Sequence, residues 1–577
     1  MPQSYSPVDF PQDWSQVSMS ASNQFTDAPS DDAGDDIGNH ATWNPLATAG
    51  GSTYTIGNTT FRGDSTADDV AKGTIAVSSG KYYWRIYLDA VQADGYPQVG
   101  IQQINKVTTL TGGFAGSDDF TWVIFCQGSG TASPGGQGRH NSSETSQILS
   151  GIVATDYIDH ALDMDAGKLW WGRNGTFSGD PAAGSGEAYS GITGTVYPFA
   201  NTYTSSNATI DITGGTAPSG YGRLSTADLP KPTVTNPSDH FTVKTLVNGG
   251  TPNTSFDTGL ASVGLIMDKR TDGTGGWEWW DIARGANALL QSDNNDDEVT
   301  KSGNSFSGGT FNFDNTTNIG AANTSHIVYS WIAGGAPSSD EGGAITSNVS
   351  AAGHGGFSVG TYSGTGSAST VGHGLSRAPS WVIVKMRSGS GTQTWTTWQE
   401  DIADALGSDR YIILSAADAA TNGASFSSTA PTSSAFSVGN DATNQSSSTF
   451  CFWAFAKTPG LIASGSYTGN GSSDGPAVVV DDGASGFKPA WLMIRSMAAG
   501  NWNIVDATRD PYNPVVDGIR LNANIAEFSG QTMDFLANGF KLRLSGSDYN
   551  TSSQKYIYLA MAENPFGGSS IAQARAR

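Results

Sequence analysis

The chain has 577 residues, with 52 acidic against 29 basic side chains and a formal net charge of −23. One hydrophobic core rarely serves more than about 250–300 residues, so the length predicts several domains. The negative charge excludes nucleic acid as the expected partner, because it would repel a phosphate backbone. No apolar run approaches the roughly 20 residues of a membrane-spanning helix, so we expect no membrane insertion.

The composition predicts an all-β protein. Its 74 glycines, with abundant Ser, Thr and Asn, supply turns, and the 16 Trp, 19 Tyr and 24 Phe give every segment large apolar side chains to bury. Only Cys126 and Cys451 occur, and we assign them below to different domains. We therefore expect neither a disulfide framework nor a four-thiolate metal site.

Residues 1–40 are predicted to form an extended arm. They hold four prolines and an acidic patch at 31–36, with little apolar periodicity. Two interpretations stay open: a disordered terminus, or a docking strand that orders against a neighbouring protein. Residues 1–10 lack the basic start and apolar run of a secretory signal, so we expect a soluble protein made in the cytoplasm.

Residues 41–229 show short alternating apolar runs separated by turn pairs, a pattern typical of an antiparallel β-sandwich. The run 81–88 predicts one strand, and 161–165 leads through a tight turn into another at 168–171. Asn174-Gly175 predicts a further reversal, because both residues tolerate the positive φ of two-residue hairpin loops.

The segments 78–84, 98–101 and 161–170, followed by Asn174-Gly175 and Tyr197-Pro198, resemble a SPRY domain in the version found in phage proteins. This resemblance implies a bent, concanavalin-like β-sandwich. It also implies binding of partners through loops at one end, without catalytic chemistry.

Residues 230–240 are predicted to be a linker between domains. Three prolines fall within the eight residues 230–237, where they fix φ and remove ladder hydrogen bonds.

Beyond this linker the chain repeats itself three times. An apolar strand opens each copy and an aromatic-rich strand closes it, the pairs being 264–267 with 329–333, 381–385 with 452–456, and 491–495 with 558–562. Opening to closing takes 65, 71 and 67 residues, a constancy that unrelated loops would not keep. We predict three β-sandwich units in series: unit 1 at 241–342, unit 2 at 343–460, and unit 3 with a short C-terminal tail at 461–577.

The segments 281–285, 327–335 and 556–566 resemble a module repeated in structural proteins of marine and environmental phages, often after a phage SPRY domain. The resemblance covers nearly the rest of the chain. It implies a virion component and leaves almost no residues for an enzyme domain.

Two acid–base pairs recur three residues apart, Asp281 with Arg284 and Asp506 with Arg509. Unit 2 breaks the pattern by offering Gln399 and Ile402. We predict structural ion pairs, because a catalytic pair would need a further acid or nucleophile nearby and none recurs.

Other candidate sites have weaker signals. Asp163 and Asp165 share one strand face before a hairpin, where turn capping is favoured over hydrolysis. The seven histidines are scattered singly, which predicts no zinc site or Ser-His-Asp arrangement. The densest run of oxygen ligands offers weak calcium candidates without the spacing of a calcium motif, and a solvated acidic loop is favoured instead: Asp293, Asp296, Asp297 and Glu298.

A glycine-rich loop is predicted from Gly128 to His140, after the apolar strand 122–126. Long loops at the end of a sandwich tend to carry binding function, although a flexible insertion is the favoured interpretation. Arg139 and His140 are our weak candidates for a binding site.

Together the resemblances imply a bacteriophage virion protein, and we expect a tail-fibre or receptor-binding subunit that contacts the host cell surface. Expected partners are other virion proteins and a host receptor, including glycan; we expect no enzyme activity, no cofactor and no bound metal. Exposed edge strands of isolated sandwiches predict a homo-oligomer, and analogy with phage fibres favours a trimer. Two alternatives stay open: a head-decorating fibre or scaffold protein, and a glycan-degrading tailspike enzyme.

Overall fold

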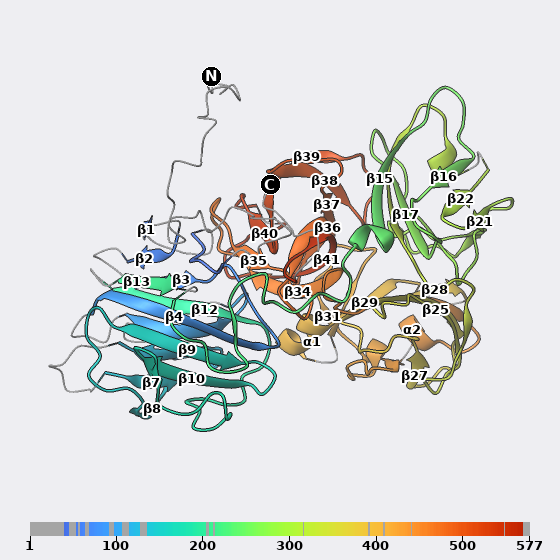
Figure 1. The fold of residues 1–577 in the computed structure, drawn as a ribbon. Helices are drawn as coiled ribbons and strands as arrows, with labels where there is room; N and C mark the ends of the chain where they lie inside the picture. The colour runs from blue at the N-terminus through green and yellow to red at the C-terminus, as the bar shows by residue number, and fades with distance from the viewer. Residues whose placement is uncertain are drawn as a thin grey trace, which may run out of the picture.

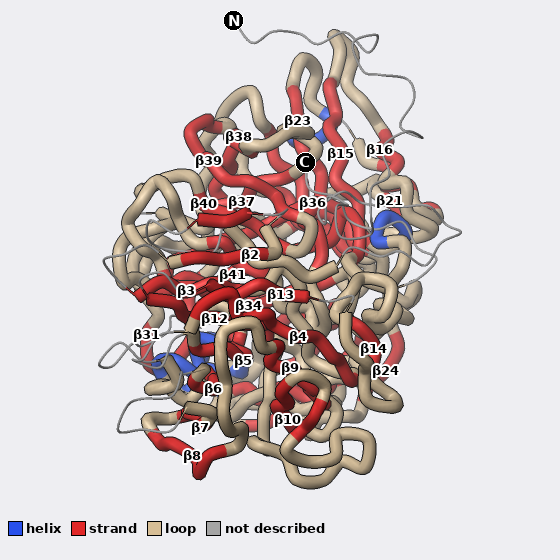
Figure 2. The backbone as a smooth tube through the Cα atoms, turned by 60° about the vertical axis from the view of Figure 1, so that its left-hand side comes forward, coloured by secondary structure: helices blue, strands red, loops and turns tan. Residues whose placement is uncertain are grey.

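The regular elements of the computed structural model are almost all antiparallel β-strands (Figure 1), which confirms the predicted all-β class. Figure 2 shows how little of the described backbone is helical, and none of these helices is long and apolar enough to cross a membrane. The structure describes residues 40–568 except 46–52, 56–57, 64–67, 92–96, 107–114, 127–134, 204–206, 212–213, 315–316, 390–392, 408–409, 440 and 547. The predicted arm lies outside the described residues apart from His40, and so do residues 569–577.

Residues 40–229, the N-terminal sandwich, form two sheets whose strands lie at the lower left of Figure 1. The first sheet has the order β1 (Thr53–Thr55), β2 (Thr60–Arg62), β13 (Asn207–Asp211), β4 (Lys81–Ala90), β9 (Tyr157–Asp163), β10 (Lys168–Arg173), β11 (Thr176–Phe177), with β14 (Gly222–Arg223) parallel to β4. The second has the order β3 (Asp68–Lys72), β12 (Val196–Tyr203), β5 (Gln98–Gln103), β6 (Thr121–Phe125), β7 (Gln137–His140), β8 (Ser143–Gln147).

Alternating side chains from these two sheets meet in one core, which contains the fully buried Trp84 and Trp171. The predicted strands at 81–88, 161–165 and 168–171 correspond to β4, β9 and β10. The predicted reversal is confirmed, since Asn174 and Gly175 have φ of 51° and 85° between β10 and β11.

Each repeat unit is built on four strands in the same order. They are β15 (Phe241–Val247), β23 (Ser325–Trp331), β17 (Leu265–Arg270), β18 (Glu278–Asp281) in unit 1; β26 (Phe357–Ser363), β33 (Thr449–Phe455), β28 (Trp381–Ser388), β29 (Trp395–Gln399) in unit 2; and β34 (Ile462–Thr468), β41 (Lys555–Pro565), β36 (Phe487–Ser496), β37 (Asn503–Asp506) in unit 3. The opening and closing strands pair in matching register, with Leu265 opposite Trp331, Trp381 opposite Phe455, and Trp491 opposite Met561.

Additional elements complete each unit. They are β16 (Ser255–Asp257), β19 (Ala288–Leu289), β20 (Val299–Thr300), β21 (Ser305–Ser307), β22 (Thr310–Asn312) and η5 (Asn318–Gly320) in unit 1; β24 (Ser338–Asp340), β25 (Ser347–Ala351), β27 (Ser369–Gly372), α1 (Glu400–Leu406), β30 (Arg410–Ile413), β31 (Thr421–Asn422), η6 (Ala424–Phe426), β32 (Ala435–Val438) and α2 (Asp441–Asn444) in unit 2; and β35 (Ala477–Val479), β38 (Val515–Arg520), β39 (Phe528–Leu536) and β40 (Gly539–Leu542) in unit 3. Because β24 pairs with β25 in the sheet of unit 2, that unit begins before Ser338, earlier than the predicted boundary at 342.

The sequence predicted three separate units in series. In the structure the three units instead pack around one core to which all of them contribute. We call this cluster the shared core; its members include Leu265, Met267, Trp279, Tyr329 and Trp331 of unit 1, Trp381, Ile383, Trp395, Trp453 and Phe455 of unit 2, and Trp491, Met493, Trp502, Leu559 and Met561 of unit 3. The alternate residues of the same strands, such as Ile266, Val382 and Leu492, face a separate core inside each unit. Both faces of each central sheet are therefore buried, which explains why these strands are continuous apolar runs.

Tryptophan contacts close the three units into a cycle. The rings of Trp279 and Trp453 join units 1 and 2 at 5.1 Å, those of Trp331 and Trp491 join units 1 and 3 at 5.9 Å, and those of Trp381 and Trp502 join units 2 and 3 at 5.9 Å. Three indole N–H groups also donate to backbone carbonyls of a neighbouring unit: Trp277 to Arg520 O (2.8 Å), Trp395 to Gln291 O (3.1 Å) and Trp502 to Ile413 O (2.9 Å).

The residues predicted to be a linker, 230–240, are packed against the repeats and include the short helix η4 (Pro237–Asp239). Val234 is only 4% exposed and belongs to the shared core, and its backbone N–H donates to Pro459 O at 3.0 Å. Residues 230–240 are therefore an ordered segment packed on the repeats and not a flexible linker.

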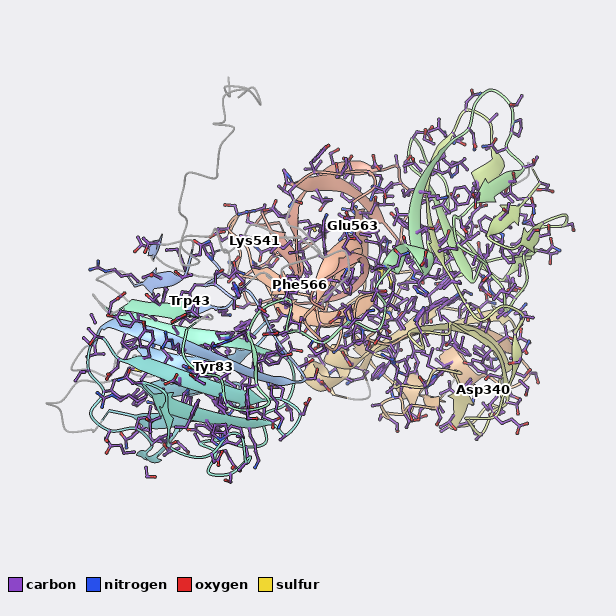
Figure 3. The ribbon with its side chains drawn as sticks, viewed as in Figure 1. Trp43, Tyr83, Asp340, Lys541, Glu563 and Phe566 are labelled. Carbon is purple, nitrogen blue, oxygen red and sulfur yellow. The ribbon has the colours of Figure 1, made fainter. Side chains whose placement is uncertain are left out.

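The N-terminal sandwich is attached to unit 3. Phe566, directly after β41 and labelled in Figure 3, belongs to the core cluster of the N-terminal sandwich, and Gly568 N donates to Thr226 O at 3.0 Å. Asn538 of unit 3 donates from Nδ2 to Thr74 O at 3.0 Å, and Asn105 donates from Nδ2 to Val479 O at 3.0 Å.

Candidate functional site

Both predicted acid–base pairs are present, and in each the aspartate is the last residue of its strand, β18 in unit 1 and β37 in unit 3. Asp281 closes β18 and accepts from Arg284 Nε at 2.5 Å, with both side chains fully buried. Asp506 closes β37 and accepts from Arg509 Nε at 2.6 Å. In each case the other carboxylate oxygen accepts the backbone N–H of the arginine at 2.9 Å, so the aspartate also fixes the turn.

Long-range partners extend these pairs across the boundaries between units. The Arg284 guanidinium lies over the ring of Trp453 in unit 2, 5.4 Å from its centroid, and it contacts Glu298 at 3.2 Å. Glu298 also accepts from two nitrogens of Arg387 in unit 2, at 2.9 and 2.6 Å. Burial acts to raise the pKa of Glu298, but the hydrogen bonds from Arg387 and the charge of Arg284 outweigh it and hold that pKa below its ordinary value.

The boundary between units 3 and 1 is built in the same way. Tyr329 of unit 1 donates its hydroxyl to Asp506 at 3.0 Å, and Glu527 accepts from Arg509 at 2.7 Å. Burial alone would lower the pKa of Arg509, but the charge of Asp506 and the hydrogen bond to Glu527 act in the opposite direction, and that pKa is raised above its ordinary value.

Unit 2 replaces this pair with neutral groups at the corresponding position. Gln399 Oε1 accepts from Ile402 N at 3.1 Å, so the amide caps the turn as the aspartates do elsewhere. Ile402 is fully buried in the shared core, where no guanidinium is needed. The three sites therefore hold units together, and their buried charges are already paired.

The four weak calcium candidates do not converge. Asp293 accepts from Trp277 N at 2.7 Å and Glu298 is held by two arginines, whereas Asp296 and Asp297 are exposed. Within the part of the chain that the structure describes, no three His, Cys, Asp or Glu side chains could hold a metal ion together.

Arg139 and His140 lie on strand β7, not on the loop that the glycines suggested; residues 127–134 of that loop lie outside the described residues. The ring of His140 stacks on Trp122 at 4.5 Å and 10°, and Arg139 donates to Ser117 Oγ at 3.1 Å. Gly138 lies on this strand with the ring of Tyr189 packed against it. A Cβ at position 138 would lie 3.0 Å from that ring, so the position requires a residue without a side chain. The two side chains thus contact the sandwich itself.

Asp163 and Asp165 stabilise the turn between β9 and β10 and its neighbour. Asp163 accepts from Ala166 N at 2.9 Å and pairs with Lys81 at 2.8 Å, while Asp165 accepts from Gly80 N at 2.8 Å. These contacts are those of turn-capping residues.

One buried arrangement has no signal in the sequence. His326 Nδ1 lies 3.0 Å from both carboxylate oxygens of Asp268, and His326 Nε2 lies 2.9 Å from Thr324 Oγ1. The Thr324 hydroxyl donates to Ala321 O at 2.6 Å, so it accepts from the imidazole, the reverse of an activated nucleophile. His326 and Asp268 are also fully buried, so this Thr-His-Asp set is structural.

A polar groove of about 310 Å³ lies on the sheet of unit 2. It is lined by Ser339, Thr346, Ser347, Asn348, Thr361, Tyr362, Ser363, Arg387 and Thr449. Asn348 on β25 stands opposite both Ser339 on β24 and Thr361 on β26, and Ser363 stands opposite Thr449 on β33, so hydroxyl and amide groups form rows across four strands. The arrangement offers hydrogen-bond donors and acceptors and no acidic side chain.

One family model matches the part of the chain that holds the repeats. The model of a family described as a domain of unknown function (DUF7483) matches residues 236–565, from just before β15 to the end of β41. A search of curated proteins found no match.

Solved structures of SPRY domains are similar to part of the chain. The SPRY domain of human HERC1 is 20% identical, covers 30% of this chain and 99% of its own, and has a TM-score of 0.23. The PSpry domain of TRIM65 (11% identical, 30% and 91%, TM-score 0.23) and a human SPRY domain (11% identical, 28% and 96%, TM-score 0.21) are also similar.

The DUF7483 match spans more than half of the 577 residues and includes all three repeat units. The chain therefore belongs to the DUF7483 family.

Proposed function

We propose that the protein is a structural and adhesive subunit of a tailed-bacteriophage particle, a tail-fibre or receptor-binding component that displays surfaces to the host. The observation that supports this most is the shared core, which joins three units into one body to which Phe566 fixes the N-terminal sandwich. Such a body suits display, because its surfaces keep fixed positions relative to one another. The resemblance of 281–285, 327–335 and 556–566 to a module of phage structural proteins supports the same assignment.

The charged residues of the repeats favour a scaffold over an enzyme. Asp281 and Asp506 are committed to buried guanidinium partners, and the His326–Asp268 pair is enclosed. A hydrolase needs a carboxylate or hydroxyl that can reach its substrate, so these groups serve stability in our proposal.

We expect the protein to form a homo-oligomer through its free strand edges, with a trimer favoured by analogy with phage fibres. Light scattering of the purified full-length chain measures this directly. A strictly monomeric mass at micromolar concentration would contradict the predicted homo-oligomer. It would not test the adhesive role.

The experiment that tests the proposal is immunogold labelling of purified particles of a phage encoding this chain, with antibody against the full-length protein. We expect gold on the tail; gold on the head would support the alternative of a head-decorating fibre, and absence from particles would overturn the proposal. Release of reducing ends from host polysaccharide by the purified protein would instead support a tailspike enzyme.

A further inference from the structure

The polar groove of unit 2 is created by two strands that have no counterpart at the same edge of the other units. In units 1 and 3 the central sheet ends at β15 and β34, whereas in unit 2 the strands β25 and β24 continue it beyond β26. One face of β25 points toward the core of unit 2 and contributes Val349 to it. On the opposite face, Thr346 and Asn348 line the groove, and neither residue belongs to a hydrophobic core.

The groove begins where the shared core ends. Along β26, Phe357 and Val359 belong to the shared core, and the next residues on that face are Thr361 and Ser363. Along β33, the same face changes from Trp453 and Cys451, which belong to the shared core, to Thr449. The floor of the groove thus continues a buried apolar face with polar side chains: Thr361 and Ser363 on β26, Thr449 on β33 and Arg387 on β28.

The polar groups of the groove are available to a ligand. No side-chain hydrogen bond is made to another described residue by Ser339, Thr346, Asn348, Thr361 or Ser363, and all but the partly buried Thr361 are exposed. The only charged side chain in the lining, Arg387, is already paired with Glu298 through two of its nitrogens. The groove therefore offers uncharged donors and acceptors in a protein whose net charge of −23 disfavours anions.

We propose that this groove binds a neutral saccharide. Each sugar hydroxyl is both donor and acceptor, as are the Ser and Thr hydroxyls that line the groove, and the Asn348 amide can do both at once. The groove of about 310 Å³ lies at the lower end of the roughly 300–1,000 Å³ typical of small-molecule sites, which fits a short segment of a glycan chain. The inference rests on the proposed function, since a host-surface glycan is a ligand for an adhesive subunit.

The test is binding of the full-length protein to a printed array of neutral and acidic oligosaccharides, followed by titration of the strongest neutral binder. The groove variant Asn348→Ala/Thr361→Ala/Ser363→Ala should weaken binding at least tenfold. The matched control is Thr468→Ala, because Thr468 occupies in unit 3 the position of Ser363 but has no added strands beside it. This control should bind within twofold of the unchanged protein.

A second variant guards against loss of folding. Asn348→Trp changes one exposed side chain and fills the groove, so it should abolish binding while leaving the unfolding temperature unchanged. No binding to any neutral oligosaccharide, binding to acidic ones alone, or binding that survives both groove variants would overturn the inference. Those results would leave the virion role standing, because immunogold labelling decides that role independently.

Discussion

The N-terminal sandwich and the three repeats bury their tryptophans in different ways. Trp84 and Trp171 lie in one core between the two sheets of the N-terminal sandwich. In the repeats, each central sheet is covered on one face by its own unit and on the other by two neighbouring units, with Trp453 and Trp491 among the residues of the shared core. The first arrangement is built by one domain apart from Phe566, whereas the second requires all three units.

Deletion of one repeat unit should have the largest effect on folding, and it should affect the repeats and not the N-terminal sandwich. Deletion of residues 461–568 would expose the shared-core faces of units 1 and 2, including Trp331 and Phe455, and we expect insoluble protein. Residues 40–235 alone should stay soluble and fold cooperatively. Size-exclusion chromatography and near-ultraviolet circular dichroism measure both; a soluble, monomeric two-unit product would show that the shared core is dispensable.

Single tryptophan truncations should separate the two regions within the intact chain. Trp453→Ala leaves a cavity in the shared core, and Trp171→Ala leaves one in the N-terminal sandwich; each should cost about 3–5 kcal/mol. Scanning calorimetry should show Trp453→Ala lowering only the transition of the repeats and Trp171→Ala lowering only that of the sandwich. Equal shifts of one common transition would mean that the regions unfold together.

The next largest effect on stability should come from the buried ion pair of Asp506 and Arg509 at the boundary between units 3 and 1. Asp506→Asn removes the charge that compensates Arg509, whose side chain is only 6% exposed, and should destabilise the repeats by about 3 kcal/mol. The control is Asp272→Asn in the more exposed pair with Arg270, which should change stability by about 0–1 kcal/mol. Chemical denaturation measures both, and equal effects would contradict a role for Asp506 at this boundary.

Per unit of pH, the smallest effect is a pH dependence of opposite sign in the two regions. Burial lowers the pKa of His160 in the N-terminal sandwich from 6.5 to about 3, so between these values only the unfolded chain binds the proton, and stability falls as pH falls. Burial, assisted by the charge of Asp268, raises the pKa of Glu278 in unit 1 from 4.5 to about 8, so there stability falls as pH rises. Each slope is at most about 1.4 kcal/mol per pH unit.

Calorimetry between pH 4 and 8 should therefore show the two transitions moving in opposite directions. Glu278→Gln should flatten the dependence of the repeats and leave that of the sandwich unchanged. A dependence of the repeats that is unaltered in this variant would assign it to other groups.

Local spacing predicted much of the fold. The constant interval between opening and closing strands located β17, β28 and β36 with their partners, and the three-residue spacing of Asp281 and Arg284 located an ion pair. Both succeed because the interactions involved are local or repeated. The third position, Gln399 and Ile402, looked like a broken pattern until the structure showed an amide performing the same capping.

The remainder depended on contacts between distant residues. The apolar runs of the repeats fit a buried sheet but do not say which surface covers the second face, so the shared core was missed. His326 and Asp268 are 58 residues apart and carry no joint motif. Gly138 suggested a loop although it lies on a strand, because its small size is required by Tyr189 and not by the backbone.

Phe566 has a consequence for the order of assembly during synthesis. Domains generally fold as they leave the ribosome, N-terminal first, and most of the N-terminal sandwich can form early. Phe566 fills its place in that core only after β41 has emerged, at the other end of the described chain. The N-terminal sandwich is thus completed by a residue that follows the third unit, so its final packing reports that all three units have been made.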